Sequence, residues 1–203
     1  MKIICVGLNY PRHADEIGMK AESAPVVFLK PDTALLRDNM PFYVPDWASR
    51  FDFETELVFR ISRLGRHIEE RFASRYYDSV GLGIDFTARD LQHELASKGQ
   101  PWEICKAFDY SAAVSKLMPL TDLPPVKDMT FSLKVNGEER QKASASEMLH
   151  SIDSIISYVS RFFSLRIGDL IFTGTPTGVG PVKEGDRLEA ELCGHKLLDF
   201  DIK

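Results

Sequence analysis

Hydrophobic and polar positions alternate along much of the chain, which is the pattern of strands with one buried face. Short apolar runs rich in β-branched residues, each ended by turn formers, predict strands at 2–6 and 25–29. The segment 130–143, "TFSLKVNGEERQKA", alternates and contains Asn136 and Gly137, the dipeptide typical of a two-residue hairpin turn. Further strands are predicted in "DLIFTGTP" (169–176) and "RLEAELCGHKLLDFDI" (187–202).

Helical periodicity is confined to two segments. In "SIDSIISYVSRFFSL" (151–165) the apolar residues recur at helical spacing, and Ser151 is a suitable N-cap. The segment "TARDLQHELASKG" (87–99) also predicts a helix, closed by Gly99 and Pro101. We therefore expect a mainly β fold with a few helices, of the α+β class. No internal repeat, low-complexity tract or linker is present, so residues 1–203 are expected to form a single domain.

One predicted strand, "FDFETELVFR" (51–60), places Asp52, Glu54 and Glu56 at alternate positions. Alternate residues share a face, so the strand has an acidic front and an apolar back. Neighbouring charges on that face lie about 6.6 Å apart and repel by roughly 2.5 kcal/mol at an effective dielectric near 20. Two explanations remain open here: a solvated outer face, or a bound hard divalent cation, which prefers carboxylate oxygens.

Composition narrows the class of protein. The 203 residues are 44% hydrophobic and 27% charged, as in an ordinary globular protein, and the formal net charge of -5 argues against a nucleic-acid partner. The first apolar run is too short for a signal peptide and no run has transmembrane length, so no membrane association is expected. Three cysteines without metal-type spacing suggest neither a disulfide framework nor a zinc site, and we expect a cytoplasmic location.

Other polar residues stand in unusual surroundings. Asp85 follows a glycine-punctuated apolar run, where a turn or helix cap is the simplest explanation, and Lys106 lies in an apolar neighbourhood, where a surface lysine is the simplest explanation. His13 and Glu16 are three residues apart, so on a helical turn the carboxylate would raise the basicity of the imidazole. The Gly/Thr/Pro-rich "FTGTPTGVGP" (172–181) fits neither phosphate-binding fingerprint and reads as a turn able to hold a small anion.

Taken together and in this order, "VGLNYPRHADE", "FLKPDTAL", "FDFETELVFRI", "GIDFTARDLQ", "WEICKAFD" and "GDLIFTGTPTGVGPV" resemble the fumarylacetoacetate hydrolase family. The similarity is greatest to its short, single-domain acylpyruvate hydrolase branch, and it spans about Val6 to Val182. The combination of E-x-E, D-x-T-A-R-D-x-Q and T-G-T-P-x-G-V-G is far more specific than any one motif. The resemblance implies a mixed β-sandwich roll and a homodimer.

The resemblance also implies a role for each matching residue. Glu54, Glu56 and Asp85 would bind Mg²⁺ or Mn²⁺, with Ca²⁺ a possible substitute in a crystal, and Asp52 would be an outer group. Catalysis would involve Lys106 beside the ion and a His13/Glu16 dyad that activates water. Substrate contacts would come from Arg89, Gln92 and Thr175. Leu8 and Ile84 depart from the family pattern, which usually has Arg and Asn there, and the departure concerns the distal substrate contacts more than the metal ligands.

The implied activity is metal-dependent hydrolysis of a carbon–carbon bond in acylpyruvate-type 2-oxo acids, giving pyruvate and a carboxylic acid. Like charge from the ion would favour the neutral form of Lys106, which could then serve in proton transfer. Three alternatives stay open: oxaloacetate decarboxylation, isomerisation or decarboxylation of unsaturated dicarboxylic 2-oxo acids in aromatic catabolism, and a relative that binds metal without catalysis. In every enzymatic case the partner is a small 2-oxo acid.

Overall fold

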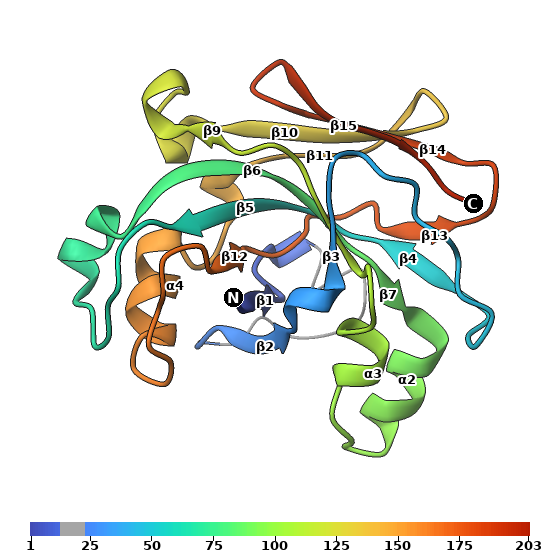
Figure 1. The fold of residues 1–203 in the computed structure, drawn as a ribbon, viewed down its shortest axis with the longest axis horizontal. Coiled ribbons are helices and arrows are strands. Elements are labelled where there is room, and N and C mark those ends of the chain that lie inside the picture. Colours follow the sequence, from blue (N-terminus) through green and yellow to red (C-terminus); the bar gives the residue numbers. More distant parts are fainter. Residues whose placement is uncertain (13–22) are drawn as a thin grey trace.

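The computed structural model describes residues 1–12 and 23–203, and β-sheets form most of its framework (Figure 1). The largest sheet has the order β2-β1-β12-β5-β6-β8-β3, with β9 paired to β6. Its strands are β1 (Ile3–Gly7), β2 (Val26–Lys30), β3 (Leu35–Leu36), β5 (Thr55–Ile61), β6 (Tyr77–Asp85), β8 (Ala112–Val114), β9 (Met118–Pro119) and β12 (Leu170–Phe172). Most neighbours are antiparallel, whereas β1 runs parallel to β12 and β3 parallel to β8. The mainly β prediction is confirmed.

Two smaller sheets complete the framework. A four-stranded sheet has the order β11-β10-β14-β15, formed by β10 (Thr130–Val135), β11 (Glu138–Ser144), β14 (Arg187–Leu192) and β15 (His195–Asp201). A three-stranded sheet joins β4 (Phe51–Phe53), β7 (Thr87–Ala88) and β13 (Gly180–Val182). The four-stranded sheet covers β5 and β6, seen at the top of Figure 1. The opposite face of β5 and β6 therefore lies on the concave side of the large sheet.

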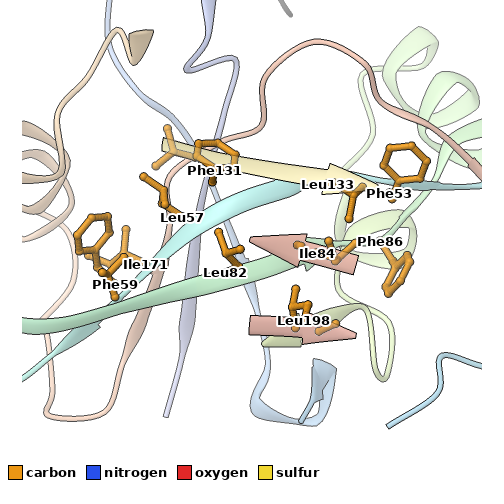
Figure 2. Packing of buried hydrophobic residues seen from close by; sticks show 14 of the residues in the cluster. Phe53, Leu57, Phe59, Leu82, Ile84, Phe86, Phe131, Leu133, Ile171 and Leu198 are labelled. Atoms are coloured by element: carbon orange, nitrogen blue, oxygen red, sulfur yellow. The ribbon is translucent and has the colours of Figure 1, made fainter. Parts of the chain in front are cut away.

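The main hydrophobic core fills the space between the two larger sheets (Figure 2). Leu57 and Phe59 of β5 lie on the same side as Leu82 and Ile84 of β6, and Phe131, Leu133 and Leu198 come from the covering sheet. Because successive strand residues point to opposite faces, Glu56 and Val58 belong to the other side of β5. Val58 accordingly packs in a second cluster, with Cys5 and Phe172.

The hairpin prediction is confirmed in detail. Val135 pairs with Glu138, and the two turn residues Asn136 and Gly137 have φ of 54° and 81°. Positive φ at both central residues is what a type I′ turn requires, and its twist matches that of the flanking strands.

Two helix predictions are confirmed with corrected ends. The helix α4 (Ile152–Val159) begins after Ser151, whose hydroxyl accepts the Ser154 N–H at 3.2 Å, but it ends six residues before the predicted limit. The helix α2 (Arg89–Ser97) starts two residues later than predicted, because Thr87 and Ala88 pair with β4 as β7. A single-turn helix, α3 (Glu103–Lys106), follows it. In the part of the chain that is described, none of the helices is long and apolar enough to cross a membrane.

Candidate metal and substrate site

Strand pairing brings three acidic side chains together. Glu56 pairs with Gly83, and the Asp85 N–H donates to the carbonyl of Glu54 at 2.8 Å, so Asp85 stands beside the two glutamates. One carboxylate oxygen from each of Glu54, Glu56 and Asp85 lies within 4.8 Å of the others. All three residues are buried, with exposed fractions of 6%, 2% and 0%. The explanation by a solvated acidic face is therefore wrong. We call Glu54, Glu56 and Asp85 the carboxylate triad.

Lys106 lies inside the triad rather than on the surface. Its Nζ is 2.7 Å from Glu54 Oε2 and 2.9 Å from Asp85 Oδ2, and the residue is only 3% exposed. Burial disfavours the charged amine, but the two carboxylates outweigh that effect and raise the pKa of Lys106 above its usual value. The two carboxylates therefore favour the ammonium form of Lys106, so the expectation of a neutral amine concerns the protein with a cation bound.

A second buried lysine was not predicted. Lys30, at the end of β2, is 1% exposed and places its Nζ 2.7 Å from Asp85 Oδ1. It also donates to the hydroxyl of Ser111 at 3.0 Å and to the carbonyl of Lys106. In the sequence, Lys30 ends an apolar strand just before Pro31, a position where a lysine ordinarily faces solvent. Its near-complete burial beside a carboxylate results from the tertiary packing.

Asp52 has the outer position expected for it. Its carboxylate accepts from Arg89 Nε at 2.8 Å and from Arg50 Nε at 2.7 Å, and Arg89 Nη2 reaches Glu54 Oε1 at 2.5 Å. Asp52 thus holds Arg89, which in turn holds a triad carboxylate. Arg89 Nη1 also donates to Gln92 Oε1 at 2.5 Å, which brings together two of the predicted substrate contacts.

The loop after β12 supplies the other side of the site. Gly174, with φ of 96°, donates its N–H to Glu56 Oε2 at 2.6 Å. The neighbouring Thr175 is buried, and its hydroxyl oxygen accepts from Gln141 Nε2 at 2.9 Å, which leaves the hydroxyl proton available to a ligand. Both polar groups of the Gln141 amide have partners, because its Nε2 also donates to the carbonyl of Pro176 at 2.9 Å and its Oε1 accepts the Thr55 N–H at 3.0 Å. Gln141 is a further site residue that was not predicted, although its polar side chain on the buried face of β11 was a signal.

Asn9 is another residue that was not predicted. It is fully buried, and its side-chain amide donates to the carbonyl of Thr173 at 2.8 Å and to that of His150 at 3.0 Å. Its Oδ1 accepts the His150 N–H at 2.7 Å. Asn9 thereby anchors the start of the loop that carries Gly174 and Thr175.

The site contains a cavity of about 130 Å³. Its lining includes the carboxylate triad, Lys106, Arg89, Gln92 and Thr175, together with Val6, Gly7, Leu8, Phe28, His93, Ala96 and Trp102. The predicted metal ligands and substrate contacts therefore share one cavity. His13 and Glu16 lie outside the described residues, so the predicted dyad stays a prediction.

The triad fits a hard divalent cation. The triad and Asp52 together make four buried carboxylates, and they lie beside three buried cationic side chains, those of Lys30, Arg89 and Lys106. Burial raises the pKa of Glu56 well above its usual value, and the charges of Asp85 and Glu54 raise it further. A site whose available ligands are carboxylate oxygens suits Mg²⁺ or Mn²⁺ better than a soft metal.

Comparison with known proteins places the chain in a family. The fumarylacetoacetate (FAA) hydrolase C-terminal family model matches residues 2–200. The chain is 42% identical to the mitochondrial oxaloacetate tautomerase FAHD1 of Mus musculus, covering 99% of this chain and 91% of that protein. It is 39% identical to the oxaloacetate tautomerase YcgM of Escherichia coli K12, covering 97% and 90%. The crystal structure of fumarylpyruvate hydrolase from Pseudomonas aeruginosa, in complex with Mn²⁺ and pyruvate, superposes with a TM-score of 0.93 at 36% identity and covers 100% of this chain and 90% of that one. The chain belongs to the fumarylacetoacetate hydrolase family.

Proposed function

We propose that this protein is a divalent-metal-dependent enzyme that interconverts the keto and enol forms of oxaloacetate. The observation that carries the proposal is the carboxylate triad with Lys106 Nζ between Glu54 and Asp85 in one cavity. Such a site combines a place for a cation with a proton carrier beside it. Near full-length similarity to oxaloacetate tautomerases from a mammal and a bacterium supports this choice of reaction.

Tautomerisation needs no co-reactant. The C3–H bond breaks, its electron pair becomes the C2=C3 double bond, and the 2-oxo oxygen gains a proton. A divalent ion held by the triad would supply Lewis acidity that makes the C3 proton easier to remove.

The chain's own residues would bind the substrate and move the proton. Lys106 lines the cavity and its Nζ is held by Glu54 and Asp85, so it can hold a proton and return it to the substrate. The Thr175 hydroxyl proton is free to donate to a substrate carboxylate, because Gln141 occupies an acceptor position of the same oxygen. Gln92 offers its amide N–H groups, since its carbonyl oxygen already accepts from Arg89.

Hydrolysis of an acylpyruvate is the second candidate. It is favoured by the similarity to the fumarylpyruvate hydrolase that was crystallised with Mn²⁺ and pyruvate. It requires an activated water, the role proposed for His13 with Glu16, and attack on the distal carbonyl would release pyruvate and a carboxylic acid. The two reactions share the metal and the enolate-stabilising charges but differ in their need for water activation.

The test is an assay of metal-stripped protein with oxaloacetate and acetylpyruvate, each with and without Mg²⁺ or Mn²⁺. Enol absorbance measures tautomerisation, and a coupled lactate dehydrogenase assay measures released pyruvate. A tautomerase accelerates metal-dependent loss of the oxaloacetate enol without pyruvate release. Metal-dependent pyruvate from acetylpyruvate, abolished in His13→Ala, would favour the hydrolase instead, and pyruvate from oxaloacetate would indicate a decarboxylase.

Glu56→Gln tests the triad directly, and Glu94→Gln on the exposed face of α2 is its matched control. We expect the first to remove metal-dependent turnover and the second to keep it. Full turnover by metal-free protein, or by Glu56→Gln, would contradict the proposal.

A further inference from the structure

Arginine side chains gather at the end of the molecule away from the triad. They belong to two segments, 62–75 between β5 and β6 and 161–168 between α4 and β12, which lie at the left of Figure 1. The seven residues of β5 separate this end from the triad by about 20 Å. The two segments contain two glutamates, no lysine and six arginines. All six arginines are exposed: Arg63, Arg66, Arg71, Arg75, Arg161 and Arg166.

Backbone hydrogen bonds hold the two segments side by side. The Gly65 N–H donates to the Leu165 carbonyl at 3.0 Å, and the Leu165 N–H donates to the Gly65 carbonyl at 2.8 Å. The His67 N–H donates to the carbonyl of Ser160 at 2.9 Å, and the Ile68 N–H donates to its hydroxyl at 2.9 Å. The six arginines therefore come from adjoining loops, and we call them the arginine patch.

Four arginines of the patch lie over aromatic rings. Their guanidinium carbons are between 4.6 Å and 6.0 Å from a ring centroid: Arg71 and Arg75 at Phe72, Arg63 at Tyr76, and Arg161 at Phe162. Such contact orders a guanidinium group without occupying its N–H donors. Among the described residues, only Arg71 of the patch has a carboxylate within ion-pair distance, that of Glu69 at 2.9 Å. The patch therefore presents ordered positive charge with N–H donors left for an anionic partner.

Large apolar side chains are exposed among these arginines. Leu64 follows Arg63, and Phe162 and Ile167 follow Arg161 and Arg166; all three apolar residues are more than half exposed. Single exposed apolar residues are ordinary on a protein surface, whereas a group of them marks an interaction site. Here they alternate with arginine on two adjoining loops, so the partner has to offer both negative charge and an apolar phase.

We propose that the arginine patch binds the surface of an anionic phospholipid membrane. Guanidinium groups form paired hydrogen bonds with phosphate oxygens, and a negatively charged lipid surface attracts clustered arginine. Leu64, Phe162 and Ile167 would enter the boundary between head groups and acyl chains. A single-stranded nucleic acid fits less well, because it is bound by aromatic rings that stack on its bases, and Leu64 and Ile167 are aliphatic.

The uneven distribution of charge explains why composition did not indicate this surface. The formal net charge of the whole chain is -5, yet the two segments carry six arginines against two glutamates. The expectation of no membrane association came from the lengths of apolar runs, and a patch formed by two loops contains no such run. Because the patch and the triad lie at opposite ends of β5, binding here does not depend on the reaction that the cavity supports.

Co-sedimentation of the full chain with vesicles tests the patch. We expect binding to vesicles that mix phosphatidylcholine with phosphatidylglycerol, no binding to pure phosphatidylcholine, and weaker binding as added salt screens the charges. Glycerol 3-phosphate and an oligouridylate, each added at the phosphate concentration of the vesicles, test a soluble phosphate ester and RNA as partners. Neither should displace the protein from the vesicles.

Two variants separate the charged and the apolar contributions. Arg63→Gln/Arg75→Gln/Arg161→Gln should weaken vesicle binding about 100-fold, at about fivefold for each arginine near an anionic membrane. Leu64→Ser/Ile167→Ser should weaken it about tenfold, because less apolar surface is removed from water. All five residues are exposed, so the variants should keep the Tm and the turnover of the unchanged protein.

Lys98→Gln/Lys142→Gln/Lys196→Gln is the matched control, because it removes three exposed charges from the end of α2, from β11 and from β15. It should weaken vesicle binding less than about threefold, since charges beyond a screening length contribute little. No binding to anionic vesicles, equal binding to neutral ones, or equal weakening by the control would overturn the proposal. Displacement by oligouridylate, with no effect of Leu64→Ser/Ile167→Ser, would also overturn it and would indicate RNA as the partner.

Discussion

Replacement of Lys30 by methionine isolates the contribution of the lysine that the sequence did not predict. Lys30 Nζ and Asp85 Oδ1 are 2.7 Å apart and both residues are fully buried, so their attraction is about 6 kcal/mol at an effective dielectric near 20. Desolvation of the two ions offsets much of this, and removing one partner of a buried pair typically costs about 3–5 kcal/mol. Because Lys106 still pairs with Asp85, we expect the lower end, about 3 kcal/mol.

In a chain of this size, about 3 kcal/mol corresponds to a fall in Tm of about 6–12 °C, which calorimetry or urea unfolding of metal-free protein measures. Lys98→Met is the matched control, because Lys98 pairs with Glu94 at 2.5 Å on the surface, where both side chains are more than half exposed. Such a pair is worth about 0.3–0.5 kcal/mol. The deficit of Lys30→Met should shrink with saturating Mg²⁺, which offsets the charge on Asp85. A loss below about 1 kcal/mol in metal-free protein would refute the reasoning.

Three further predictions follow from the site. Glu56→Gln should abolish the rise in Tm that Mg²⁺ produces, as differential scanning fluorimetry would show, and an undiminished rise would argue against the triad as the metal site. Because the pKa of Glu56 is raised in the folded protein, its carboxyl is protonated in the folded state at pH values where it is ionised in the unfolded state, so the free energy of unfolding of metal-free protein should fall as pH rises through this window. Mg²⁺ binding should release protons in the same window. Calorimetry in buffers of different ionisation enthalpy would measure this release, and its absence would contradict the reasoning. Gly174→Ala should destabilise by about 1–3 kcal/mol, because φ is 96° and the new Cβ would stand 2.8 Å from the Cβ of Asn9; Gly137→Ala, also at positive φ but with open space around it, separates the clash from the backbone strain.

The local sequence was sufficient to predict several elements. The Asn136-Gly137 turn and the Ser151 cap follow from backbone preferences of single residues, which neighbours do not override. The E-x-E spacing likewise predicted that Glu54 and Glu56 share a face, given that the segment 51–60 was predicted to be a strand. Element ends were less certain: the start of α2 at Arg89 depends on the pairing of Thr87 with Asp52, which no local pattern predicts.

What only the tertiary structure decided is which distant groups share the buried site. Lys30 and Asp85 are far apart in sequence, and so are Gln141 and Thr175, yet each pair lies within 3 Å because the strands and the loop that carry them converge on one cavity. A lysine or glutamine in an alternating strand has the same local pattern whether it faces water or protein. Burial turns such a residue into a necessary partner, since an unpaired polar group inside the protein is costly, and burial is a property of the whole fold.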